Sequence, residues 1–250
     1  MRATNLLRLA DALPRGPIVA IGIAAGFAFC LGAYVGMQPS TGTEVLPVQE
    51  GMGEMSQEEM MEMYDQAGQP DQHHEALKVF VGTWDADLKT MMEGWEEFNT
   101  TGTATYEMTM GGRFLAMDFK STVMGEPMNG MNLTGYHKAK ERYESIWVDD
   151  SSTALNYMTG QKTDDGWVYE GEETDPVAGQ TLPVRDVIVM QGDDKFTFTR
   201  HYPAEAAGMM GIPVEEGAKW APGFEIVYTR AKGDAAGGGA GNAAGTLNRR

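Results

Sequence analysis

Alternating apolar and polar residues run from about residue 79 to residue 230 of this 250-residue chain. In the first such stretch Trp84, Ala86 and Leu88 share one side, and the residues between them are charged. A period of two places successive side chains on opposite faces of a β-strand. Turn residues recur about every ten positions, and no helical pattern intervenes. The pattern therefore predicts a mainly β fold, an antiparallel sheet that curls into a barrel or a sandwich.

The alternation predicts about nine or ten strands. They are expected at about 79–90, 103–110, 114–120, 131–137, 141–149, 152–160, 166–172, 181–191, 195–201 and 223–230. Gly111 and Gly112 predict a two-residue hairpin turn. The stretch 203–222 lacks the alternation and is expected to form a long loop near the C-terminal end.

Two details favour a barrel over a sandwich. Gly82-Thr83-Trp84 opens the first strand, and Arg230 ends the otherwise apolar face of the last strand. An arginine over a tryptophan ring contributes a cation–π contact of about 0.5–2 kcal/mol. Trp84 and Arg230 are therefore expected to close the barrel where first and last strands meet. A G-x-W opening paired with a terminal arginine resembles lipocalin-like (calycin) barrels.

Longer segments extend this resemblance to one bacterial family. They are HEALKVFVGTWDADLKTMM, GTATYEMTMGGRFLAMDFK, NLTGYHKAKERYESIWVDDSSTALNYMTGQ, DPVAGQTLPVRDV and FEIVYTR, in that order. The chain resembles the family catalogued as domain of unknown function 1579 over about residues 73–230. The likeness breaks at 209–220, where this chain carries extra loop. It implies the lipocalin-like barrel, over a domain at 73–231, and no particular reaction.

The N-terminal region predicts a membrane anchor. Residues 17–37 contain no charge, and as a helix they would span roughly 31 Å, which matches a bilayer core. The basic residues lie in 1–16, so the positive-inside rule keeps that segment cytoplasmic and places the barrel in the periplasm or cell envelope. A cleaved signal peptide is the alternative. Residues 38–55 read as a flexible linker.

Two short helices are expected before the barrel. Ser56 and Glu59 have capping-box spacing at the start of a methionine-rich helix over 56–72, and a second helix covers about 71–80. The methionines are expected to form the buried face of the first helix, with Cu(I) binding by thioethers as the alternative. The Gly/Ala-rich tail, 232–250, has little to bury and is expected to be disordered.

Charge and cysteine content exclude some functions. The formal net charge is −17, and the stretch between the basic N-terminal 40 residues and the tail is still more acidic. Such a surface repels phosphates, so nucleic-acid binding is excluded as a leading function. Cys30 is the single cysteine, which leaves no intrachain disulfide and no cysteine-based metal cluster.

The residues do not assemble a catalytic or metal site. The four histidines are expected on helix ends or outward-facing positions, a haem ligand being the alternative, and there is no nucleophile motif. Asp149-Asp150 and Asp164-Asp165 are turn signals first and calcium ligands second. No catalytic residue, metal or cofactor is therefore predicted. The histidines in question are His73, His74, His137 and His201.

The inward-facing positions are the remaining candidates for a function. The expected lining is apolar and rich in methionine, a residue that repacks around varied shapes. Arg113 and Arg185 are the candidates for an internal polar anchor, for example to a carboxylate head, an edge or surface position being the alternative. The lining is expected to comprise Tyr106, Met108, Met110, Leu115, Met117, Phe119 and Trp147.

These observations predict a membrane-anchored barrel that binds a small apolar or amphiphilic molecule non-covalently. Small antiparallel barrels either fill with side chains or hold one ligand, so two alternatives stay open. One is an interaction or envelope-structure module with a filled barrel, and the other is an enzyme of unknown type. The oligomeric state is left open.

Overall fold

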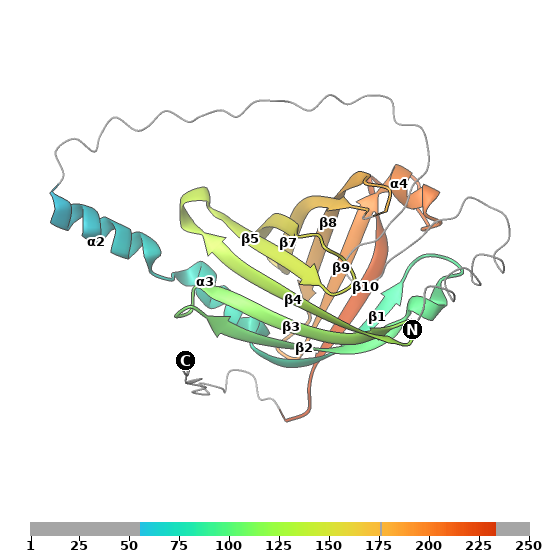
Figure 1. Ribbon diagram of the computed structural model, residues 1–250, viewed down its shortest axis with the longest axis horizontal. Helices are drawn as coiled ribbons and strands as arrows, with labels where there is room; N and C mark the ends of the chain where they lie inside the picture. The colour runs from blue at the N-terminus through green and yellow to red at the C-terminus, as the bar shows by residue number, and fades with distance from the viewer. Residues whose placement is uncertain (1–55, 176, 234–250) are drawn as a thin grey trace, which may run out of the picture.

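The computed structural model describes residues 56–175 and 177–233. Within them the chain forms a closed antiparallel barrel of ten strands, each paired with its sequence neighbours, and β1 also pairs with β10 (Figure 1). The strands are β1 Gly82–Thr90, β2 Thr100–Thr109, β3 Phe114–Val123, β4 Glu126–His137, β5 Arg142–Asp149, β6 Asn156–Lys162, β7 Gly166–Thr174, β8 Thr181–Met190, β9 Lys195–Pro203 and β10 Trp220–Arg230.

Short helices stand at both ends of the barrel. α3 lies at one end and α4 at the other, whereas α2 extends away from the barrel (Figure 1). The helices are α2 Gln57–Gly68, α3 Gln72–Ala76, η1 Leu77–Phe80, η2 Glu96–Phe98, η3 Lys138–Lys140 and α4 Ala204–Met209.

The predicted antiparallel barrel is confirmed, and two connections differ from expectation. The β2–β3 turn has four residues, 110–113, because Met110, Gly111 and Gly112 all adopt positive φ; the predicted two-residue turn is wrong. The stretch 203–222 is only partly a loop. α4 and the start of β10 lie within it, and Ala207 and Ile212 are buried there.

One end of the barrel is plugged by α3 and η1. The Asp71 carboxylate accepts from the His73 amide, and His74 Nδ1 accepts from the Asp71 amide, so a reciprocal cap starts the helix. The prediction that His74 fixes a helix end is confirmed. Leu77 and Phe80 then point inward and are buried, which closes this end of the interior to water.

Arg230 joins this plug to the seam of the barrel. Its guanidinium lies 4.1 Å from the centre of the Trp84 ring, at the point where Trp84 pairs with Arg230 across β1 and β10. The same guanidinium donates to the carbonyl oxygens of Val79, Val81 and Asp193. The Trp84 indole donates to the Phe80 carbonyl at 2.7 Å. The expected contact of Trp84 with Arg230 is therefore present, and it also fastens the segment entering β1.

The methionine-rich helix α2 begins as expected and packs differently. Ser56 and Glu59 form both hydrogen bonds of a capping box. No residue of α2 is buried, and Met63 and Tyr64 are largely exposed. The expectation of a buried methionine face is therefore wrong for the described part of the chain. The barrel lies beside the helix's C-terminal end and leaves its apolar face uncovered.

Several expectations fall outside the described residues: the basic segment 1–16, the anchor 17–37, the linker 38–55 and nearly all of the tail 232–250. Within 56–175 and 177–233, no helix is both long enough and apolar enough to span a bilayer.

Replacing Arg230 by methionine tests the seam. Arg230→Met leaves three carbonyl oxygens without their charged donor, and we expect it to lower the free energy of unfolding by about 3 kcal/mol. Arg185→Met is the control, because Arg185 faces outward toward Glu170, and it should cost less than about 1 kcal/mol. Urea unfolding followed by tryptophan fluorescence measures both, and equal losses would contradict the proposed role of Arg230.

Candidate functional site: an internal cavity

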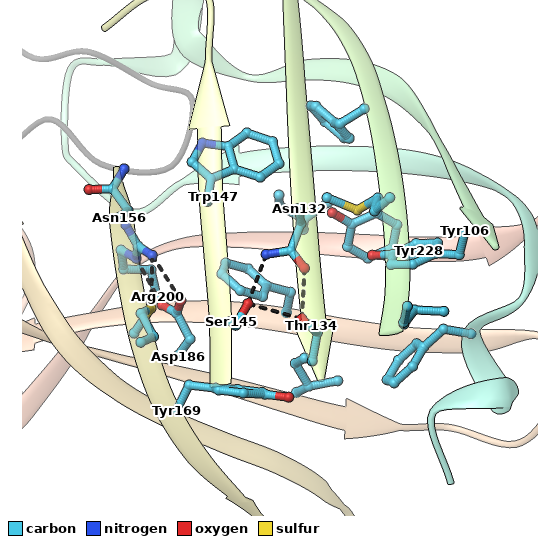
Figure 2. A pocket seen from close by; sticks show the side chains of 18 of the residues that line it. Tyr106, Asn132, Thr134, Ser145, Trp147, Asn156, Tyr169, Asp186, Arg200 and Tyr228 are labelled. Carbon is cyan, nitrogen blue, oxygen red and sulfur yellow. Dashed lines mark hydrogen bonds and ion pairs between the residues drawn. The ribbon is translucent and has the colours of Figure 1, made fainter. Parts of the chain in front are cut away.

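A cavity of about 120 Å³ lies inside the barrel (Figure 2). Leu77 and Phe80 of the plug bound one end of it, and Trp147 and Asn156 line it near the opposite end. Its apolar walls come from nearly every strand, because the inward positions of the alternation converge there. They include Leu88, Leu115, Met117, Phe119, Met128, Met158, Ile188, Phe198, Phe224 and Ile226.

A neutral hydrogen-bonded cluster interrupts the apolar wall on β4 and β5. Asn132 Nδ2 donates to Ser145 Oγ at 2.8 Å, and Thr134 Oγ1 donates to Asn132 Oδ1 at 2.7 Å. Thr134 and Ser145 oxygens are 3.0 Å apart. These contacts fix the three side chains in one arrangement (Figure 2). The cluster presents uncharged hydroxyl and amide groups that can form hydrogen bonds with a ligand.

Trp147 covers the barrel backbone at the rim. Its indole donates to Asp149 at 2.8 Å, and its ring lies over Gly130 on the neighbouring strand. A Cβ at Gly130 would stand 2.2 Å from the ring, so only glycine permits this approach. Asn156 lies opposite Trp147 in the β5–β6 register. Its side chain has no hydrogen bond within the described residues, so its amide is available to a ligand.

A buried ion cluster forms the polar wall on β7, β8 and β9. Arg200 binds Asp186 through two hydrogen bonds of 2.8 Å, and a third reaches Glu173 at 3.0 Å. All three side chains are buried, and Tyr202 donates a further hydrogen bond to Glu173. Arg200 also points one N–H at the weakly accepting sulfur of Met158, 3.6 Å away. Arg200 and Asp186 line the cavity, while Glu173 lies behind them.

The pKa values within the cluster follow from burial and from its charges. Burial alone would lower the pKa of Arg200, but the carboxylates of Asp186 and Glu173 outweigh it and raise that pKa. Burial raises the pKa of Glu173, and Arg200 only partly opposes the rise. Arg200 therefore stays charged, and Glu173 holds its proton more tightly in the folded chain than in the unfolded chain. The Asp186–Arg200 pair is then nearly neutral as a unit.

Three tyrosines add neutral hydroxyls to the cavity wall. Burial raises the pKa of Tyr106, Tyr169 and Tyr228. Tyr106 and Tyr228 share a hydrogen bond. The hydroxyls therefore stay protonated at neutral pH, and the cavity exposes hydrogen-bonding groups without a free charge.

The structure brings together only part of the predicted lining. Tyr106, Leu115, Met117, Phe119 and Trp147 line the cavity. Met108 is partly buried and packs against the core without lining it.

Met110 does not line the cavity. Its side chain is 71% exposed, because the turn begins at Met110 and the strand alternation stops there. Both predicted arginine anchors also lie outside the cavity. Arg113 donates to the carbonyl oxygens of Gly68 and Met110, and Arg185 faces Glu170 at 3.7 Å.

The ion cluster is the feature that the sequence reasoning missed. Strand parity contained the signal, since Arg200 shares the inward parity of Phe196 and Phe198, and Asp186 shares that of Val184. A charged residue on an apolar parity is buried and needs a partner of opposite charge. Parity alone did not show that β8 and β9 place Asp186 directly opposite Arg200.

Among the described residues, the hydroxyls that line the cavity are not paired with a general base. No cavity-lining hydroxyl bonds to a carboxylate or an imidazole, and no histidine lines the cavity. His73 stacks on Tyr136 at 3.9 Å, and His201 faces out of the barrel. In 56–175 and 177–233 no three His, Cys, Asp or Glu side chains are grouped to hold a metal ion. Copper binding by the methionines of α2 stays a prediction.

Two substitutions separate the members of the ion cluster. Asp186→Ala leaves Arg200 without its bidentate partner and should lower the free energy of unfolding by about 3–5 kcal/mol. Glu173→Gln keeps a neutral acceptor for Arg200 and Tyr202, so it should cost much less at neutral pH. Urea unfolding measures both, and a greater loss for Glu173→Gln would contradict this assignment.

Glu173 also predicts a pH dependence. Its pKa is raised above 4.5 in the folded chain, so between 4.5 and the folded pKa the folded state binds more protons than the unfolded state. Its contribution to stability is therefore complete at low pH and is lost as pH rises through the folded pKa. The Glu173→Gln substitution should remove the part of the stability loss with rising pH that Glu173 causes. Unfolding curves measured across that pH window test it, with unchanged slopes as the contradicting result.

The family model described as "Protein of unknown function (DUF1579)" matches residues 69–230. No curated protein matches the chain.

Solved structures that the chain resembles include three with low sequence identity. Rv2717c from M. tuberculosis is 14% identical, with a TM-score of 0.42 over 66% of this chain and 100% of that one. A redesigned beta barrel is 11% identical, with a TM-score of 0.33 over 63% and 96%. EF1p2_mFAP2b bound to DFHBI is 16% identical, with a TM-score of 0.32 over 63% and 98%.

Proposed function

Because the chain belongs to the DUF1579 family, whose name assigns no activity, we propose a function from its own cavity: non-covalent binding of one small, neutral, amphiphilic molecule. The observation that carries the proposal is a cavity with apolar walls and a neutral polar cluster, deep inside a barrel. Side chains that pack solidly would leave no such space.

The volume limits the ligand to a small molecule. An apolar cavity of about 150 Å³ holds one benzene in another protein, and this cavity measures about 120 Å³. It is smaller than the 300–1,000 Å³ of sites for drug-sized ligands. A single ring or a short alkyl group with one hydrogen-bonding substituent fits this space, and a whole acyl chain does not.

The charges of the wall favour a neutral ligand. Asp186 uses both carboxylate oxygens on Arg200, and Arg200 spends most of its N–H groups on carboxylates. A ligand carboxylate placed here would lie against Asp186, and the described residues that line the cavity include no free cation to pair it. Asn156 and Ser145 offer hydrogen bonds to an alcohol, amide or ether instead. A carboxylate head is therefore not part of this proposal.

The proposal includes the predicted location. Residues 17–37 anchor the chain in the membrane and residues 38–55 connect the anchor to the barrel outside the cytoplasm. Small amphiphiles concentrate at the membrane surface, so an anchored barrel meets them there.

A set of single-ring probes tests ligand size and charge. We expect benzyl alcohol and toluene to raise the thermal unfolding temperature of the full chain in lipid nanodiscs in a concentration-dependent way. Benzoate, of nearly the same shape, should have no effect. A cavity that accepts none of the three, or benzoate best, would refute the proposal.

Replacing Asn156 tests the polar contact. Asn156→Ala removes an amide that has no partner in the described structure, so it should leave stability within about 0.5 kcal/mol. It should weaken benzyl alcohol binding about tenfold and leave toluene binding unchanged, since only the alcohol needs the hydrogen bond. Thr159→Ala, on the outer face of the same strand, is the matched control. Equal losses for both probes would assign Asn156 a structural role.

A further inference from the structure

A second hollow lies outside the barrel, beside the base of α2. It is a groove of about 480 Å³, called the outer groove here. Its floor is formed by Phe114, Leu133, Ile146 and Tyr157, on the outer face of β3, β4, β5 and β6. Leu133, Ile146 and Tyr157 are directly opposite one another in the strand register. The result is a continuous apolar row on a surface that normally faces water.

The rim of the outer groove is positively charged. Arg113 donates to the Gly68 carbonyl, and Lys138 donates to the carbonyls of Gln66 and Gln69. These partners are uncharged carbonyl groups, so they do not neutralise either cation. The two positive charges stand out in a chain whose net charge is −17. Glu144 also lines the groove, but Arg142 and Lys140 bind it there and hold its pKa at about 2, although burial opposes them.

Helix α2 has the complementary surface. Met60, Met63, Tyr64 and Ala67 follow the i, i+3, i+4, i+7 spacing and share one face. None of them is buried. The helix also carries four acidic residues and no basic one. A 12-residue helix is only marginally stable without tertiary contacts. Packing of its apolar face against another surface would therefore stabilise α2.

We propose that the outer groove binds α2 of a second copy of this chain, and that two copies exchange their α2 helices reciprocally. The dimensions agree: α2 is about 18 Å long, and the row from β3 to β6 is about 14 Å wide. Apolar residues of α2 cover the floor, and its carboxylates approach Arg113 and Lys138. The same pair of surfaces is used twice, which gives a closed two-fold dimer.

Two other occupants fit less well. The chain's own α2 is held at its C-terminal end by Arg113 and Lys138, and folding it onto the groove would break those hydrogen bonds. A membrane surface suits amphipathic helices with a basic polar face, whereas the polar face of α2 is acidic and is repelled by anionic lipid.

Cysteine cross-linking between two tagged chains tests the exchange. Full-length Cys30→Ser chains with either Met63→Cys or Leu133→Cys, each with a different tag, are expressed together and oxidised with diamide in their membranes. Docking holds the two thiols at a millimolar effective concentration. We expect at least about tenfold more disulfide-linked heterodimer than when Thr103→Cys, on the outer face of β2, replaces Leu133→Cys.

Two further arms decide between the occupants. Glu62→Cys, on the opposite face of α2, should link poorly to Leu133→Cys. A chain with both Met63→Cys and Leu133→Cys reports intrachain linkage by its faster gel migration. Predominantly intrachain linkage, no linkage above the Thr103→Cys control, or equal linkage from Glu62→Cys would each overturn the proposal. The side chains substituted at positions 62, 63, 103 and 133 are exposed, and circular dichroism checks that the barrel has folded.

Discussion

Closure of the sheet by β1 and β10 is the constraint on which the rest of the structure depends. A closed barrel leaves no unpaired strand edge, and here the seam is also the place where the chain enters the barrel. Arg230 binds the carbonyl oxygens of Val79 and Val81 while its guanidinium lies on Trp84. The last strand therefore holds the first strand and the plug together. Leu77 and Phe80 of this plug are buried and bound one end of the cavity.

The interior combines charge and neutrality in a way that limits what it can bind. Arg200 is a strong anion binder in principle, yet its two carboxylate partners come from adjacent strands of the same wall. The positive charge of Arg200 is therefore already paired within the fold. What remains accessible is a set of hydroxyls, amides and thioethers, all uncharged. Under the proposed function, ligand recognition depends on shape and neutral hydrogen bonds.

Much of the fold could be predicted from the sequence, and less of the site. Alternation is a local property of the sequence, so it predicts the strands and their inward faces, such as that of Trp84, Ala86 and Leu88. Met110 does not line the cavity as predicted, because its positive φ ends the strand alternation. An apolar pattern in the sequence does not reveal such a backbone turn. Arg113 and Arg185 are predicted from residue type alone, whereas strand parity already places Arg185 on the outer face. The pairing of Arg200 with Asp186 depends on strand register, which the sequence leaves open. The uncovered face of α2 depends on what lies beside it, which a helix pattern cannot show.

The close approach of Trp147 to Gly130 couples two positions in the evolution of this barrel. A smaller side chain at 147 opens space that only then permits a side chain at 130, while any side chain at 130 collides with the present indole. The two positions are therefore energetically non-additive. The order of substitutions matters: a side chain at position 130 requires a smaller side chain at position 147 first. The space at this part of the barrel wall is therefore determined by the two residues together.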